Sequence, residues 1–253
     1  MRSQCVLVSG AALLSALVHV AGGQVPQGDS SAQIKKEWEL GAQARRDLEK
    51  TDGKIEDAGI IQYLQRLENK LANAGGAIPA AEIRVTRSSN VYVSATDNGV
   101  LYISGGLLQR IENEAELAGL LAHELAHTQP VTEVRPQTPA IAVVHDGCVL
   151  QANLAAPGTE EARTRQRDGE LTATAAAVAR LRAAGYDPAG VLDLFSKLAY
   201  EHPAWAKAIV PGDLLALRVK LEADPVPVGG YRIDSSEFVE AHAALETALS
   251  RKH

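Results

Sequence analysis

The sequence contains few aromatic residues and almost no cysteine. Phe, Trp and Tyr together make up 4% of its 253 residues, so the core must consist of aliphatic side chains and alanine, which favours closely packed helices. Only two cysteines occur, and Cys5 lies in an N-terminal segment that we expect to be removed. Cys148 is then left unpaired, which excludes a disulfide framework. We expect Cys148 to be a small buried hydrophobic residue.

Basic residues are not in excess, and phosphate-binding motifs are absent. The formal net charge of −6 at pH 7 provides no basic footprint, so we expect no nucleic-acid partner. No Gly-rich loop of the Walker type and no dinucleotide-binding fingerprint occurs. Hydrophobic residues at 46% and charged residues at 22% are ordinary for a globular protein, and the length allows one domain with a sizeable core, with or without an appendage.

The first 23 residues have the pattern of a secretory signal. Arg2 gives a positive start, an apolar run extends from Val6 to Val18, and small residues at 21–23 offer a cleavage site. The run is shorter than the roughly 20 apolar residues of a membrane span. We therefore expect residues 1–23 to be a signal peptide, the mature protein to be exported to the periplasm or the extracellular space, and no integral membrane domain to remain. An uncleaved N-terminal anchor is the alternative.

The chain up to residue 104 predicts helices followed by strands. Apolar residues at helical spacing, and then alternating residues, define these elements. Asp57 is the expected N-cap of the second helix, and Asp97-Asn98-Gly99 is the expected hairpin turn before the last strand. We expect a small antiparallel sheet built from the strands. The elements are, in order, helices over 34–49 and 58–74 and strands over 82–86, 91–94 and 100–104.

The stretch from His123 to His127 carries the clearest chemical signal. It reads His-Glu-Leu-Ala-His and lies in a helix that starts with a capping box at 113–116 and is apolar on nearly every side. Histidines four residues apart on a helix project from the same face, so they make half of a zinc site. Glu124 between them can reach a metal-bound water. A third ligand must come from elsewhere in the chain.

Beyond residue 128 the pattern is again mainly helical. Residues 128–158 contain several prolines and could cover a cleft as a lid. The residues alone leave several carboxylates open as the third ligand, namely Glu160, Glu161, Asp168 and Glu170. Further helices are predicted over 159–184, 188–200, 214–222 and 236–251.

These segments resemble a known family. The run from Asn113 to Leu117 leading into the histidine motif, and the run Ala184-Gly185-Tyr186-Asp187-Pro188 after it, are similar to gluzincin peptidases of the HtpX, BepA and CAAX prenyl protease type. The similarity is greatest to the exported or periplasmic members and covers roughly residues 38–203. It implies an α+β fold: a mostly helical zincin-type domain with the small antiparallel sheet beside the active-site helix. We place this domain at 24–223, followed by a linker and C-terminal helix over 224–253.

The resemblance also implies the roles of individual residues. It implies one Zn²⁺ per chain, held by His123, His127 and Glu170. Glu124 would be the general base. His202, which precedes a proline as in the family, would stabilise the transition state or close the site.

Two positions depart from the family pattern. The family has Glu-x-x-Ala-Asp around the third ligand, whereas Thr174 stands here in place of the aspartate. Tyr92-Val93-Ser94 replaces the usual Asn-Ala-Phe, and Arg218 is only a weak candidate for the arginine that usually follows His202. Loss of a partner such as the aspartate typically costs about 10- to 100-fold in metal affinity or activity.

The expected function is that of a zinc metalloendopeptidase acting on unfolded or extended polypeptide, with a place in envelope protein quality control. We expect the strand at 100–104 to be an exposed edge to which a substrate adds as a further strand. Two alternatives stay open: a zinc-binding chaperone-like or interaction module with little proteolysis, and a metal-free helical domain. The sequence does not define the oligomeric state.

Overall fold

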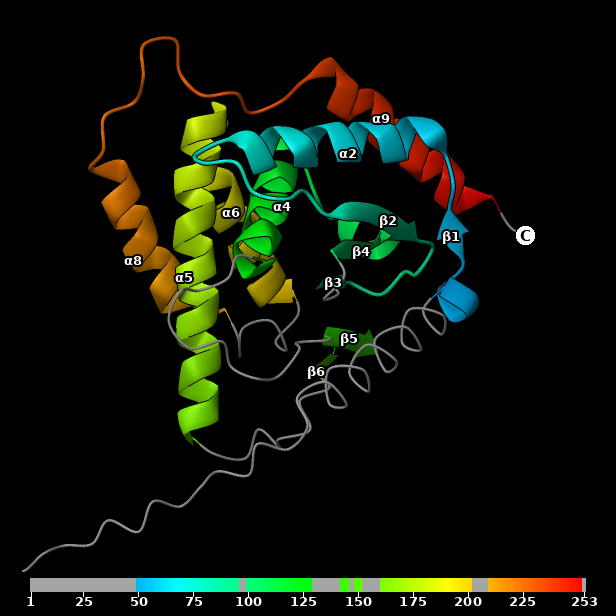
Figure 1. Cartoon of the computed structure of the whole chain (residues 1–253), viewed down its shortest axis with the longest axis horizontal. Coiled ribbons are helices and arrows are strands. Elements are labelled where there is room, and N and C mark those ends of the chain that lie inside the picture. Colours follow the sequence, from blue (N-terminus) through cyan, green and yellow to red (C-terminus); the bar gives the residue numbers. More distant parts are fainter. Residues whose placement is uncertain are drawn as a thin grey trace, which may run out of the picture.

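The computed structural model describes residues 49–95, 99–128, 142–145, 148–151, 160–201 and 209–251 (Figure 1). The expected signal peptide at 1–23 and nearly all of the expected helix at 34–49 lie outside these residues, as does His202. Within the described part, no helix combines the length and the apolar character needed to cross a membrane.

The described residues are mostly helical, with a small sheet, so the expected α+β class is confirmed. The helices are α2 (Ala58–Asn73), α3 (Gly105–Leu108), α4 (Glu114–Thr128), α5 (Glu160–Ala184), α6 (Ala189–Glu201), α8 (Pro211–Glu222) and α9 (Ser236–Ser250). The strands are β1 (Lys54–Ile55), β2 (Glu82–Thr86), β3 (Val93–Ala95) and β4 (Val100–Ser104), with a separate pair of β5 (Ala142–His145) and β6 (Cys148–Gln151).

The main sheet is mixed, and the expectation of an antiparallel sheet is wrong for one pairing. The strand order is β1-β2-β4-β3; β4 runs antiparallel to β3 but parallel to β2. The chain crosses from β2 to β3, and β4 then returns into the gap between them. All five residues of β4 are buried, which suits an interior strand. The expectation that 100–104 forms an exposed edge is therefore also wrong, since β3 occupies that edge.

A local signal begins α2 as expected, and a contact distant in the sequence satisfies its end. The Oδ1 atom of Asp57 accepts hydrogen bonds from the backbone N–H groups of Gly59 and Ile60, at 2.9 and 3.2 Å. At the other end of α2, the buried Arg180 side chain donates to the carbonyl oxygens of Leu71 and Ala74, at 2.8 and 2.6 Å. A cation at this end also complements the helix dipole.

Helix α4 is the centre of the molecule. The apolar side chains that it buries in the core are at most 2% exposed, and it packs against α2, α5 and α6 (Figure 1). Helices α2 and α9 lie side by side over the sheet, and α8 packs against α6 on the far side (Figure 1). The apolar residues of α4 that form this core are Leu117, Ala118, Leu120, Leu121, Ala122 and Leu125.

The contact between α4 and α6 is a backbone contact. A Cβ atom on Gly119 would lie 2.7 Å from Val191 Cα, and a Cβ atom on Gly190 would overlap the carbonyl oxygen of Ala115. Real Cβ atoms do not approach so closely, so only glycine fits at either position. The two glycines therefore let α6 lie directly against the helix that carries both histidines.

Residues 231–234, here called the C-terminal strap, lie against the start of α4. The carbonyl oxygen of Ile233 accepts a hydrogen bond from Ala115 N–H at 2.9 Å, and Asp234 Oδ1 accepts one from Glu114 N–H at 3.3 Å. Arg232 pairs through its backbone with Gly185 and Asp187. The bonds to Glu114 and Ala115 satisfy N–H groups that the first turn of α4 leaves open.

Candidate metal centre

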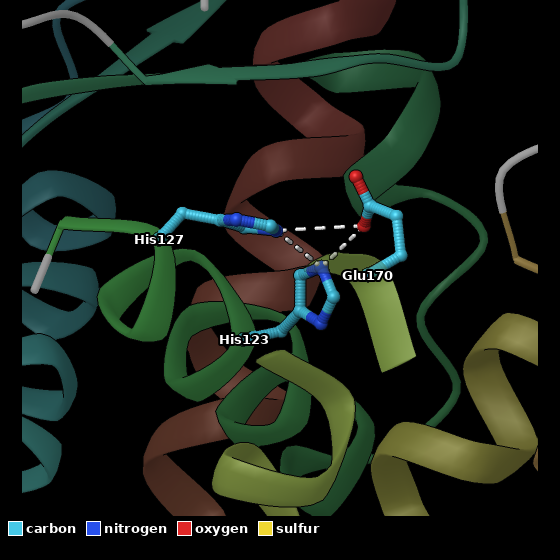
Figure 2. A group of neighbouring side chains, drawn as sticks. All are labelled: His123, His127 and Glu170. Carbon is cyan, nitrogen blue, oxygen red and sulfur yellow. Dashed lines mark hydrogen bonds and ion pairs between the residues drawn. The ribbon is translucent and has the colours of Figure 1, made fainter. Parts of the chain in front are cut away.

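Two helices bring three metal-ligating side chains together. His123 and His127 lie one turn apart on α4, and Glu170 reaches them from α5 (Figure 2). The two Nε2 atoms are 3.0 Å apart, and Glu170 Oε2 lies 3.1 Å from His123 Nε2 and 3.4 Å from His127 Nε2. The three ligand atoms thus form a compact, nearly equilateral triangle.

The triangle has the dimensions of one face of a zinc coordination tetrahedron. Ligands at about 2.0–2.1 Å from tetrahedral Zn²⁺ lie about 3.3 Å from one another. Neutral imidazole nitrogens and a carboxylate oxygen all carry lone pairs, so their convergence on one point calls for a cation. The residues present therefore fit a zinc ion.

The contacts within the triangle shift the pKa values of two of its side chains. Burial lowers the pKa of His127, but the hydrogen bond and the charge of Glu170 outweigh it and raise that pKa to about 9. Burial raises the pKa of Glu170, yet its hydrogen bonds to both histidines hold this pKa well below the usual range. Metal and proton therefore compete for the same three atoms.

The triangle is closed on one side and open on the other. The side chain of His123 is 3% exposed, whereas those of Glu170 and His127 are 20% and 35% exposed. A ligand approaching from the His127 side therefore has access to the metal position. Three protein ligands with an open position are the pattern of catalytic zinc, whereas structural sites are closed by four protein ligands.

The ring of His123 is held by neighbours on α5 and α6. Thr174 Oγ1 lies 3.3 Å from His123 Nδ1 and also donates to the carbonyl oxygen of Glu170 at 2.8 Å. The Phe195 ring stands at 90° to the imidazole, with 4.7 Å between centroids. Sequence reasoning missed Phe195, because its helical spacing on α6 indicates burial but not which side chain it contacts.

Glu124 lies between the two histidines in the sequence and is partly exposed. Burial raises its pKa above the usual value; the charges of His123 and His127 oppose this effect, and that of Glu170 adds to it. A carboxyl group with a raised pKa beside a metal position is suited to taking up and releasing a proton during a reaction.

The remaining predicted site residues are placed as follows. Of the carboxylates considered on α5, Glu170 is the one that joins the histidines among the described residues, while Asp168 and Glu160 are exposed and the Glu161 side chain is outside the description. Arg218 pairs with Asp193 at 2.6 Å, linking α8 to α6 instead of serving the site.

The part of the chain that contains α4 also matches a known peptidase family. Residues 61–135 match the model of peptidase family M48. The match includes His123, Glu124 and His127 and ends before Glu170. The expected resemblance to gluzincin peptidases of the HtpX and BepA type is thereby confirmed. It supports a metallopeptidase role for the chain.

The chain is also similar to the "Putative beta-barrel assembly-enhancing protease" of Vibrio cholerae serotype O1. The two are 26% identical over an alignment of 192 residues including gaps, and the alignment covers 68% of this chain and 40% of that relative. The chain therefore spans two fifths of the relative's length, and the similarity extends well beyond the residues of the family match.

Proposed function

We propose that the chain is a zinc-dependent metalloendopeptidase. The observation that carries this proposal is the convergence of His123 Nε2, His127 Nε2 and Glu170 Oε2 within 3.0–3.4 Å of one another. The M48 match over the histidine helix supports it independently. Zinc held by these three side chains supplies a Lewis acid that polarises the scissile carbonyl and makes water a nucleophile near neutral pH.

Glu124 is the proposed general base. Its raised pKa lets it accept the proton of the attacking water and then deliver that proton to the leaving amine. We further propose that His202 shares the charge that develops on the carbonyl oxygen. This role rests on the resemblance alone, because His202 lies outside the described residues.

The proposed substrate is an extended or unfolded polypeptide. Since β4 is paired on both sides, a substrate strand would have to pair with an edge strand of the main sheet, and the longer of its two described edge strands is β3. An added strand would bind mainly through its backbone, so sequence specificity should be modest. The signal-like residues 1–23 support action outside the cytoplasm, in the periplasm or beyond, including in envelope quality control.

The test compares the wild type with Glu124→Gln in hydrolysis of an unfolded protein at one zinc per chain. We expect the variant to keep its zinc, because Glu124 is not a ligand, and to lose about 100- to 10,000-fold in cleavage rate, the usual contribution of a general base. Asp168→Asn, on the exposed side of α5, should cleave like the wild type. Equal cleavage by wild type and Glu124→Gln would remove Glu124 from this role.

A second candidate is a zinc-binding module that holds polypeptides without cutting them. It is favoured by Thr174, an uncharged residue where the resembling peptidases have aspartate. This candidate predicts bound zinc and capture of unfolded polypeptide, with no difference in cleavage between the wild type and Glu124→Gln. Metal analysis of the purified protein separates both candidates from a metal-free domain, which would hold none.

A further inference from the structure

Thr174 contacts two of the three proposed ligand residues at once. It is 1% exposed on α5, one turn after Glu170. Its hydroxyl oxygen lies 2.8 Å from the carbonyl oxygen of Glu170 and 3.3 Å from His123 Nδ1. Among the described residues, it is the polar partner of the nitrogen of His123 that faces away from the metal position.

The direction of these hydrogen bonds follows from which atoms can donate. A carbonyl oxygen only accepts, and a hydroxyl has a single proton. The contact to the carbonyl is shorter by half an ångström, so the hydroxyl proton goes to Glu170. Toward His123 the same oxygen can only accept. Nδ1 of His123 must then carry a proton, so in the neutral ring that binds metal the lone pair is on Nε2, the nitrogen that faces His127 and Glu170.

We infer that Thr174 is a positioning residue: its hydroxyl fixes His123 in the Nδ1–H tautomer and aims Nε2 at the metal. The inference rests on the proposed zinc site and concerns how this chain holds a ligand without an aspartate. The bond to the Glu170 carbonyl also anchors the hydroxyl to the helical turn that carries the second ligand. One neutral side chain thereby sets the orientation of His123 relative to Glu170.

Packing supports the same geometry. The rings of Phe195 and His127 both make edge-type contacts with the imidazole of His123, each at 4.7 Å between centroids. His123 is 2% exposed, so ordered water does not take the place of the aspartate that the resembling peptidases have at position 174. A ring confined in this way depends on Thr174 for the position of its proton, because the contacts with Phe195 and His127 fix only its plane.

The decisive variant is Thr174→Val, which keeps the shape and the β-branch but removes the hydroxyl. We expect zinc affinity, measured by competition with a chelator, to fall about 10- to 100-fold. Thr174→Ser should restore most of the affinity. In ¹⁵N-histidine spectra of the zinc-loaded wild type, His123 should show a proton on Nδ1 and metal on Nε2.

Thr172→Val is the matched control. Thr172 lies on the same helix and donates to the carbonyl oxygen of Asp168, one turn back, at 2.7 Å, but its side chain is exposed and has no described hydrogen bond to either histidine. Its loss should leave zinc affinity unchanged, which separates a general effect of threonine on α5 from the effect at His123.

The outcomes separate this inference from the proposed function. If the wild type binds zinc and Thr174→Val binds it equally well, or if the wild-type spectrum shows zinc on Nδ1, the inference is overturned and the zinc site stands. If the wild type binds no zinc at all, the proposed function fails and the inference falls with it.

Discussion

Glu68 is a carboxyl group buried on α2. It is 0% exposed on α2, and its Oε1 atom accepts a hydrogen bond from Ala81 N–H at 3.1 Å. Its Oε2 atom has no hydrogen-bond partner among the described residues. Burial raises the pKa of Glu68 from 4.5 to about 7; the Ala81 bond and Arg180 oppose this shift, whereas Glu124 adds to it.

The raised pKa predicts a pH-dependent stability that Glu68→Gln should abolish. The folded state binds the proton more tightly than the unfolded state, so the free energy of unfolding falls as pH rises from 4.5 toward 7. Glutamine keeps an acceptor for Ala81 N–H and cannot ionise. The variant should therefore gain stability over the wild type across this pH range, on the order of 1–3 kcal/mol. Denaturant unfolding of the metal-free protein, followed by circular dichroism, measures the difference.

The control for this experiment is Glu56→Gln. Glu56 is exposed near the start of α2, so its replacement should change the free energy of unfolding by no more than about 0.5 kcal/mol at either pH. A constant difference between Glu68→Gln and the wild type from pH 4.5 to 7 would contradict the assignment of this titration to Glu68.

At the scale of residues, the sequence predicted the candidate ligands but not what holds them. The spacing of His123 and His127 places both on one helical face whatever surrounds the helix. Glu170 could be chosen among several carboxylates only by family resemblance, because the distance from α5 to α4 depends on tertiary packing. The contact of Phe195 with His123 depends on a third helix and left no trace in the local pattern.

At the scale of elements, the approach of α4 and α6 determines where Phe195 meets His123. Gly119 touches Val191, and one helical turn further along both helices His123 meets Phe195. A methyl group at Gly119 must push the helices apart, since the atoms it would meet belong to backbone that cannot rotate away.

Gly119→Ala should therefore be destabilising although alanine is the better helix former. We expect a loss of about 1–3 kcal/mol from overpacking, together with weaker zinc binding as Phe195 moves away from His123. Gly169→Ala is the matched control, because nothing lies within 4 Å of its added Cβ atom. That variant should gain up to about 1 kcal/mol from helix propensity. A stabilised Gly119→Ala protein would show that the interface yields at little cost.

The elements themselves were largely predictable, and the sheet topology was not. The expected limits of α2 are 58–74 and the observed limits are Ala58–Asn73. The strands Glu82–Thr86 and Val100–Ser104 have the limits that the sequence predicted. Alternation identifies a strand and its buried face but not its neighbours. The return of β4 between β2 and β3 therefore escaped prediction, and with it the identity of the edge strand.

At the scale of the whole molecule, the C-terminal part of the chain completes the same core that holds the metal centre. On α9, Phe238, Leu245 and Ala248 are buried, and Leu245 lines a small apolar cavity with Ile60 and Leu64 of α2. The C-terminal strap meanwhile caps the first turn of α4. Unfolding of α9 should therefore be coupled to loss of the helix that carries both histidines.

Leu245→Ala tests this coupling against Val239→Ala on the same helix. Leu245 is 3% exposed and Val239 is 58% exposed, so truncation should cost about 2–5 kcal/mol at the first and about 0.5 kcal/mol or less at the second. Zinc bound only by the folded state should raise the unfolding temperature of both variants, because ligand at about 100 times its Kd adds about 2.7 kcal/mol. If α9 unfolded separately, Leu245→Ala would show two transitions, of which only the later one would respond to zinc.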